Sequence, residues 1–203
     1  MKIKTIGLTL LLLCGFSLQT CDKDDDIDCS CPPVEGVYFD IEGVELINHR
    51  SANQIAGPIS FSEYRGLYLE YDVRFYGQKS SPKPRWDFSL IPSAHACSCL
   101  EDGYEGSEDE KLEQLTLITQ YDFDVDHLAN DTINDLVVVR KGANEQELSD
   151  YLMQSTEPLR EYWLELELKT RPLLDSTFAV KAIVELSTGE QYEVISNEVI
   201  FKN

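Results

Sequence analysis

Apolar and polar residues alternate strictly in the run Leu67-Tyr68-Leu69-Glu70-Tyr71-Asp72-Val73-Arg74-Phe75. Successive side chains of a β-strand point to opposite faces, so the run predicts a strand with one buried and one solvated face. The predicted buried residues are Leu67, Leu69, Tyr71, Val73 and Phe75. A strand that is buried on one face only is typical of an antiparallel sheet.

The same period of two predicts strands on both sides of this run, at residues 36–46, 115–125, 162–168, 178–186 and 191–201. Gly189 separates the last two and can supply the positive φ that a hairpin loop needs, so residues 178–201 predict a hairpin. Polar and proline-bearing residues predict loops at 48–58, 78–85 and 101–110.

One short helix is predicted between the strands. Asn144 can cap it, and Glu147 stands three residues later as in a capping box. Leu148, Tyr151 and Leu152 share an apolar face that continues to about Gln154. Regularly spaced strands without alternating helices indicate an all-β fold. We therefore expect residues 34–203 to form one antiparallel β-sandwich, immunoglobulin-like, with one short helix.

The first residues have the character of an export signal. Lys2 and Lys4 precede an apolar run from Ile6 to Leu13, which is shorter than the ~20 residues that a membrane span requires. The residues Leu18-Gln19-Thr20-Cys21 resemble the cleavage and lipid-attachment site of bacterial lipoproteins, although Thr20 stands where Gly, Ala or Ser is usual. This resemblance implies a signal peptide at 1–20 and acylation of Cys21; a plain secretory signal is the alternative.

An acidic segment follows Cys21, and we interpret residues 21–33 as a tether. Its run from Asp22 to Asp28 resembles the surface-export signal of lipoproteins from Bacteroidetes, and like charges also keep such a segment extended. The resemblance implies a protein anchored by its N-terminal lipid, such as palmitate, in the outer membrane. The expected location is the cell surface, with the periplasmic face as the alternative.

The charge of the chain restricts its partners. The formal net charge is −20, and loss of Lys2 and Lys4 with the signal peptide changes it to −22. Such a surface repels phosphate backbones, so we expect no nucleic-acid partner and membrane attachment through the lipid alone. The sequence predicts no cofactor.

Four cysteines remain once Cys14 is removed and Cys21 is acylated. They form two Cys-x-Cys pairs: Cys29 with Cys31, and Cys97 with Cys99. In an oxidising compartment four thiols predict two disulfides, and ring strain within a Cys-x-Cys favours bonds between the pairs. Both cross-pairings stay open, and a zinc site that includes His95 is the alternative.

One part of the chain resembles a known family. It comprises residues 94–99 (Ala-His-Ala-Cys-Ser-Cys), residues 102–107 (Asp-Gly-Tyr-Glu-Gly-Ser) and the aspartates between Asp122 and Asp126. These residues resemble an uncharacterised single-domain family of secreted Bacteroidetes lipoproteins. The resemblance implies an envelope location and carries no activity.

Exposed aromatic residues are the candidate ligand contacts. Alternation places Tyr162 on the buried face of its strand and Trp163 on the solvated face beside Glu161, Glu165 and Glu167. It places Tyr68 and Tyr76 on the polar face of their strand. Aromatic rings flanked by carboxylates suit the stacking and hydroxyl recognition of sugars, whereas cross-strand packing of the aromatics is the structural alternative.

Other constellations are weaker. Asp122, Asp124 and Asp126 begin a calcium-loop pattern that His127 and Ile133 break, so we expect a solvated strand face and no metal site. Glu165 and Glu167 have a spacing of about 7 Å that could serve an inverting glycosidase, but nothing else predicts a cleft there.

Three function classes follow from these patterns. A binding module for a glycan or a partner protein is favoured, and a structural accessory subunit of an envelope or fimbria-like assembly is the alternative. An enzyme comes third, because the chain has no nucleophile elbow, zincin, Walker or dinucleotide motif. The triplets that begin at Asp131 and Asp175 resemble Bacteroidetes O-glycan acceptor sites, with Thr132 and Ser176 as acceptors.

Overall fold

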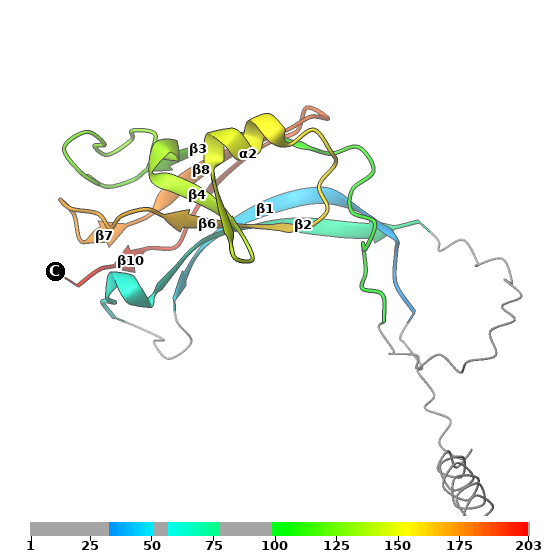
Figure 1. Cartoon of the computed structure of the whole chain (residues 1–203), viewed down its shortest axis with the longest axis horizontal. Helices are drawn as coiled ribbons and strands as arrows, with labels where there is room; N and C mark the ends of the chain where they lie inside the picture. Colours follow the sequence, from blue (N-terminus) through cyan, green and yellow to red (C-terminus); the bar gives the residue numbers. More distant parts are fainter. Residues whose placement is uncertain (1–32, 51–56, 78–98, 203) are drawn as a thin grey trace, which may run out of the picture. The chain divides into compact units, whose positions relative to one another are not determined.

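A computed structural model describes residues 33–50, 57–77 and 99–202 (Figure 1). The chain divides into two compact units, residues 1–32 with 91–99 and residues 33–90 with 100–203. Except for Cys99, the described residues belong to the second unit. The predicted signal peptide, the lipid site Cys21 and the other cysteines of the disulfide prediction, Cys29, Cys31 and Cys97, lie outside the described residues, so these remain predictions.

The larger sheet has five antiparallel strands in the order β1-β2-β6-β4-β5. The strands span β1 Tyr38–Arg50, β2 Tyr64–Tyr76, β6 Trp163–Leu168, β4 Val137–Lys141 and β5 Asn144–Glu147. The two long strands, β1 and β2, pair along almost their whole length, and β6 joins β2 to the β4–β5 hairpin.

A second sheet packs against the first and has the order β3-β8-β9. Its strands are β3 Leu112–Thr119, β8 Val180–Leu186 and β9 Gln191–Ile195. Smaller elements are β7 Thr177–Phe178, β10 Val199–Ile200, η1 Phe61–Glu63, η2 Asn134–Leu136 and helix α2 Leu148–Gln154. Helix α2 packs on β3, β4 and β5. The prediction of an all-β sandwich with one short helix is confirmed.

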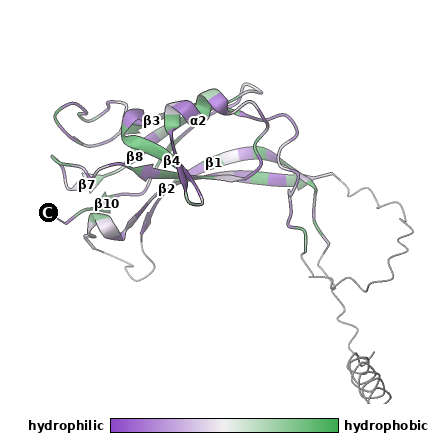
Figure 2. Ribbon diagram, viewed as in Figure 1, coloured by the Kyte–Doolittle hydropathy of each residue, from purple (hydrophilic) through white to green (hydrophobic). Residues whose placement is uncertain are grey.

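The core forms where the alternating faces of the two sheets meet. Leu67, Leu69 and Tyr71 of β2 are buried as predicted, and hydrophobic and hydrophilic residues interleave along β1 and β2 in Figure 2. Val73 and Phe75, at the far end of β2, are only half-buried. The inward face of β2 is therefore less buried towards that end of the strand.

The predicted strand at 115–125 is wrong beyond Thr119. The Thr119 hydroxyl donates a hydrogen bond to the Tyr121 carbonyl at 2.8 Å, and the chain leaves the sheet there. Phe123 still enters the core, but Val125 is 78% exposed. The apolar–polar alternation of the sequence continues past the end of the strand because the following loop also buries one aromatic residue, Phe123.

The helix begins later than predicted. Residues 144–147 form β5, whose pairing with β4 closes a two-residue turn between Lys141 and Asn144. Gly142 in that turn has a φ of 61°, a conformation that suits a hairpin turn and favours glycine. Strand β4 was missed because its run of three valines shows no alternation. Strand β1 extends to Arg50, into the predicted loop at 48–58.

Side chains cap the open edges of both sheets. On β1 the Glu110 carboxylate accepts the Ile41 N–H at 3.1 Å, and the Asn197 side chain accepts the Asn48 N–H at 2.7 Å. On β3 the Asn134 amide accepts the Leu117 N–H and donates to the Leu115 carbonyl, both at 2.7 Å. Such caps satisfy edge groups that would otherwise pair with another chain.

Glu110 provides the most buried of these caps, and burial is the main reason why its pKa is raised. We predict that Glu110→Ala lowers the free energy of unfolding by about 1–3 kcal/mol, because it leaves the Ile41 N–H and the Ser107 hydroxyl without their acceptor. Urea unfolding measures the loss. Glu110→Gln retains a carbonyl acceptor and should lose less, and the exposed Glu113→Ala should change stability by less than ~0.5 kcal/mol. Equal losses in all three variants would contradict the cap.

Candidate functional site

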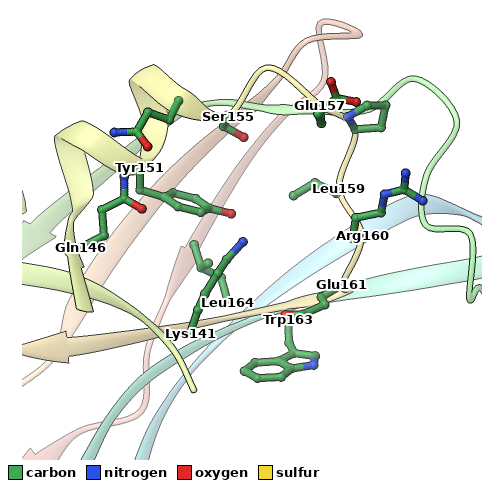
Figure 3. A pocket seen from close by; sticks show the side chains of 12 residues that line it. Lys141, Gln146, Tyr151, Ser155, Glu157, Leu159, Arg160, Glu161, Trp163 and Leu164 are labelled. Atoms are coloured by element: carbon green, nitrogen blue, oxygen red, sulfur yellow. The ribbon is translucent and has the colours of Figure 1, made fainter. Parts of the chain in front are cut away.

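A hollow of about 310 Å³ opens at the end of the larger sheet where β6 begins (Figure 3). Four parts of the chain surround it: the β4–β5 hairpin, helix α2, the segment 155–161 and the first residues of β6. Its volume is at the lower end of the ~300–1,000 Å³ that small-molecule sites occupy.

The wall formed by residues 155–161 depends on one backbone pairing. The Leu159 N–H donates to the Glu110 carbonyl at 2.9 Å, and the Ser107 N–H donates to the Leu159 carbonyl at 2.8 Å. Gly106 has a φ of 86°, and a Cβ there would collide with the Leu159 carbonyl oxygen. Glycine at 106 is therefore required for this wall to approach the sheet.

The lining offers hydrogen-bond donors and acceptors of several kinds. They comprise the amides of Gln146 and Gln154, the hydroxyls of Tyr151 and Ser155, the carboxylates of Glu157 and Glu161, and the cations of Lys141 and Arg160. Leu159 and Leu164 are buried and give the hollow an apolar floor. Acidic and basic side chains are equal in number here, in contrast to the acidic excess of the whole chain.

Lys141 and Tyr151 lie together across the opening of this hollow. The Lys141 ammonium stands 5.1 Å from the centre of the Tyr151 ring, a cation–π distance. Within the described ranges no carboxylate lies within 4 Å of this ammonium. Burial, with help from the Glu161 charge, raises the pKa of Tyr151, so its hydroxyl stays a neutral donor at pH 7.

Trp163 forms the rim of the hollow and is 40% exposed, as the alternation predicts. In Figure 3 its indole extends from β6 on the side away from Tyr151. The Tyr68 ring lies nearly parallel to the indole, with 6.3 Å between ring centres and 21° between planes. The centre of the His49 ring lies 4.1 Å from the centre of the Tyr68 ring. Trp163 and Tyr68 are therefore neighbours, with Tyr68 half-buried behind the indole.

Tyr76 is not part of this group. It lies six residues along β2 from Glu70, the residue paired with Trp163, which is about 20 Å along a strand. Its ring tilts against Tyr38, and its hydroxyl donates to Glu108 at 2.9 Å. Burial, together with this bond, raises the pKa of Tyr76 to about 12. The structure thus separates Tyr76 from the other two predicted ligand contacts.

Glu165 and Glu167 contact a cation instead of the hollow. Arg140 lies 2.6 Å from Glu167, 3.8 Å from Glu165 and 3.6 Å from Glu145, all measured between guanidinium nitrogen and carboxylate oxygen. These ion pairs cross the outer face of β6, β4 and β5. Arg140 therefore neutralises charge on the solvated face of the sheet.

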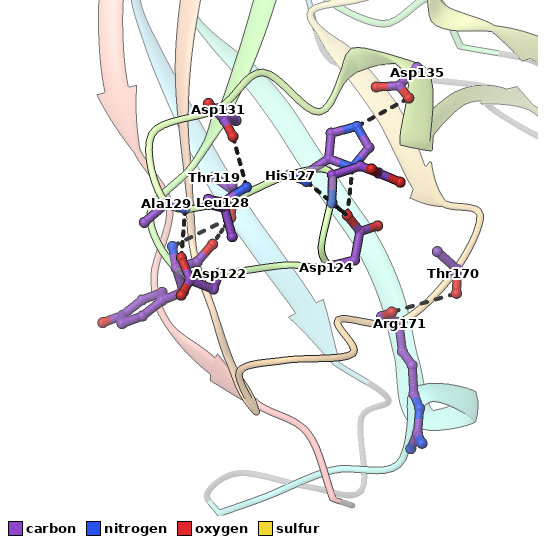
Figure 4. A network of polar contacts seen from close by, with 12 residues as sticks. Thr119, Asp122, Asp124, His127, Leu128, Ala129, Asp131, Asp135, Thr170 and Arg171 are labelled. Atoms are coloured by element: carbon purple, nitrogen blue, oxygen red, sulfur yellow. Dashed lines mark hydrogen bonds and ion pairs between the residues drawn. The ribbon is translucent and has the colours of Figure 1, made fainter.

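The aspartates at 122–131 lie on a loop rather than on the predicted strand face (Figure 4). Asp124 accepts the backbone N–H groups of Asp126 at 2.9 Å and His127 at 2.8 Å, and Asp122 accepts that of Ala129 at 2.9 Å. The His127 ring bridges Asp124 at 2.8 Å and Asp135 at 3.2 Å. Among the described residues no group of acidic, histidine or cysteine side chains is arranged to hold a metal ion.

Sequence reasoning missed most of the hollow. Tyr151 was predicted on the apolar face of the helix, and it is half-buried there and lines the hollow. Lys141 could not be placed because β4 was not predicted. Tyr162 was expected in the core, but it is 42% exposed and its ring contacts Phe39 and Phe75.

Comparison with known proteins adds no relative: no family model matches the chain, and no curated protein and no solved structure matches it. The resemblance to secreted Bacteroidetes lipoproteins stays a prediction. In the part of the chain that the structure describes, no helix combines the length and apolar character that crossing a membrane requires. Of the two predicted glycan acceptors, Thr132 is exposed and Ser176 half-buried.

The bridge made by His127 predicts a pH-dependent stability. Its hydrogen bond to Asp124 is the main reason why the pKa of His127 is raised above its ordinary value of about 6.5. A raised folded-state pKa stabilises the fold fully below pH ~6.5, and this contribution is lost as pH rises through the folded value. We expect His127→Gln to destabilise the protein more at pH 5.5 than at pH 8.5, as measured by urea unfolding.

A double-mutant cycle provides the control. In the Asp124→Asn background the anion is gone, while the amide oxygen can still accept the backbone N–H groups of Asp126 and His127. The pH dependence of the His127→Gln effect should therefore become clearly smaller, and the remainder comes from Asp135, which still lies 3.2 Å from the ring. An unchanged pH dependence in that background would contradict the assignment to the Asp124 pair.

Proposed function

We propose that this chain is a lipid-anchored binding module of the outer membrane and that its sandwich recognises a neutral glycan in the hollow beside Trp163. The observation that carries the proposal is the position of an exposed indole on the rim of a concave, polar-lined site. An aromatic ring on a flat outer face would serve cross-strand packing alone, whereas a rim position leaves one face for a ligand.

The lining chemistry supports a sugar. Each hydroxyl of a sugar both donates and accepts, and the amides of Gln146 and Gln154 can do both in return. An apolar face of a pyranose can rest on the face of the Trp163 indole that Tyr68 leaves open. Equal numbers of acidic and basic side chains in the lining favour a neutral ligand over a charged one.

The anchor is supported by the sequence alone. Cys21 follows a short apolar run and precedes the acidic tether, which would hold the sandwich away from the bilayer. More than one acyl chain gives stable attachment, because each buried methylene contributes about 0.8 kcal/mol and a single chain is marginal.

Glycan binding should depend on Trp163. A neutral-glycan array identifies the ligand, and isothermal titration calorimetry then measures its dissociation constant. We expect Trp163→Ala to weaken binding at least about tenfold, or ~1.4 kcal/mol, through loss of stacking. Trp163→Phe should retain part of the affinity because a smaller aromatic face remains.

The matched control is Tyr76→Ala, which removes another aromatic residue from the polar face of the same sheet and should leave the affinity unchanged. Thermal unfolding of each variant separates lost binding from lost folding. Absence of any neutral glycan among the array ligands, or equal effects of Trp163→Ala and Tyr76→Ala, would overturn the proposed site.

Lipid attachment has its own test. Cells that produce the full chain are grown with radioactive palmitate, and the protein is then isolated from membrane and soluble fractions. We expect label and membrane association for the unaltered chain and neither for Cys21→Ser, because only a thiol at that position accepts the lipid. Cys14→Ser is the control and should keep both. An unlabelled, soluble wild-type chain would contradict the anchor.

A further inference from the structure

Strand β2 continues past the point where β6 begins. Its pairing with β6 runs from Leu67 opposite Leu166 to Glu70 opposite Trp163, and the last bond joins the Tyr71 N–H to the Tyr162 carbonyl at 2.9 Å. Residues of the same parity as Tyr71 point their backbone groups to the same side, which places those of Val73 and Phe75 on this edge. Among the strands of residues 33–50, 57–77 and 99–202, none pairs with the edge beyond Tyr71.

The edges of β1, β3 and β5 carry features that hinder the addition of a strand. The edge of β1 is capped by Glu110 and Asn197 and is further paired through the Phe39 N–H to the Gly106 carbonyl at 3.1 Å. The edge of β3 is capped by Asn134, and β5 is short and carries Glu145 and Glu147. Short, charged or side-chain-capped edges are how proteins prevent strand addition.

This edge of β2 adjoins a second hollow, of about 450 Å³. Its lining includes Val73 and Phe75 from the inward face of β2, together with Tyr162 and Trp163 at the start of β6. Val73 and Phe75 are half-buried, and no third strand of the described part of the chain covers them. A strand added in line with β6 would place its inward side chains against these residues.

The outward face of the same region is acidic. Asp72 and Glu70 project there from β2. The neighbouring cation, Arg74, forms ion pairs with Asp40 at 2.6 Å and with Glu42 at 2.7 Å. A strand added at this edge would therefore place its outward side chains beside an excess of carboxylates. Basic side chains at the outward positions of the added strand would complement this negative charge.

We propose that the edge of β2 from Asp72 to Tyr76 accepts an extended strand of a partner protein in which apolar and basic residues alternate. Backbone hydrogen bonds to Val73 and Phe75 provide the affinity. The apolar side chains cover the half-buried inward face, and the basic ones face Asp72 and Glu70. This surface meets the glycan hollow at Trp163, which lines both, and the rest of the glycan hollow lies on the other side of the start of β6.

The test uses the full chain and a synthetic eight-residue peptide of alternating valine and lysine. Hydrogen exchange should be fast at the Val73 and Phe75 amides of the free protein and slow with the peptide bound. Val73→Pro removes the N–H that faces the edge and leaves the pairing with β1 intact, so it should weaken peptide binding about tenfold or more. Val73→Thr keeps the N–H and should bind within about twofold of the unaltered chain.

Charge is tested separately in case the proline variant unfolds. Asp72→Lys leaves the backbone unchanged and should weaken the lysine peptide about fivefold or more, while a peptide of alternating valine and glutamate should bind this variant better than it binds the unaltered chain. Val73→Pro should leave glycan affinity unchanged.

Four results would overturn the proposal. They are a failure of the lysine peptide to bind the unaltered chain, protection of the Val73 and Phe75 amides in the free protein, peptide affinity that Val73→Pro and Asp72→Lys leave intact, and a dimer in sedimentation that Val73→Pro dissociates. The last result would assign the edge to a second copy of this chain instead.

Discussion

The arrangement of this domain depends on where β6 begins to pair with β2. From Leu67 to Glu70 the strand β2 has neighbours on both sides, and beyond Tyr71 it has β1 alone among the described strands. Because β6 starts at Trp163, the indole occupies the corner where a three-strand region becomes a two-strand region. The segment 155–161 must reach this corner from helix α2, and the space that it encloses on the way is the hollow. The hollow and the open edge are thus two consequences of one register.

Side-chain caps explain how the sandwich can be stable although its two sheets differ in strand number and leave strand edges unpaired. Two sheets of five and three strands leave several strands with unpaired backbone groups, and burial of such groups without partners costs about 1–3 kcal/mol each. Glu110 and Asn197 supply the missing partners from loops 69 and 149 residues away, and Asn134 supplies them from η2, 17 residues away. A carboxylate or an amide can satisfy an edge where a full strand does not fit, so the loops can be irregular and still stabilise the sheets.

Alternation predicted the strands that bury one face, and it failed where burial has another pattern. Strands β2, β6 and β8 alternate and were predicted, as was the exposure of Trp163. Strand β4 did not alternate, and without it neither the β4–β5 turn nor Lys141 could be placed. The caps were not predictable either, because a polar residue in a loop has no sequence signal for a distant backbone N–H. The hollow is formed by segments that are distant in the sequence, so it could be recognised only in the three-dimensional structure.

The distribution of charge separates the two surfaces around Trp163. With a formal charge of −20, most faces of this protein repel anions, and two arginines reduce that repulsion on the outer face: Arg140 contacts three carboxylates and Arg74 contacts two. Lys141 is not used in this way and lies over the Tyr151 ring, where it balances the acidic side chains of the hollow. The lining of the hollow therefore carries no net formal charge, whereas a strand approaching Asp72 and Glu70 meets an excess of negative charge. The two surfaces thus differ in charge, and the two proposed ligands differ in the same way: the glycan is neutral and the strand is basic.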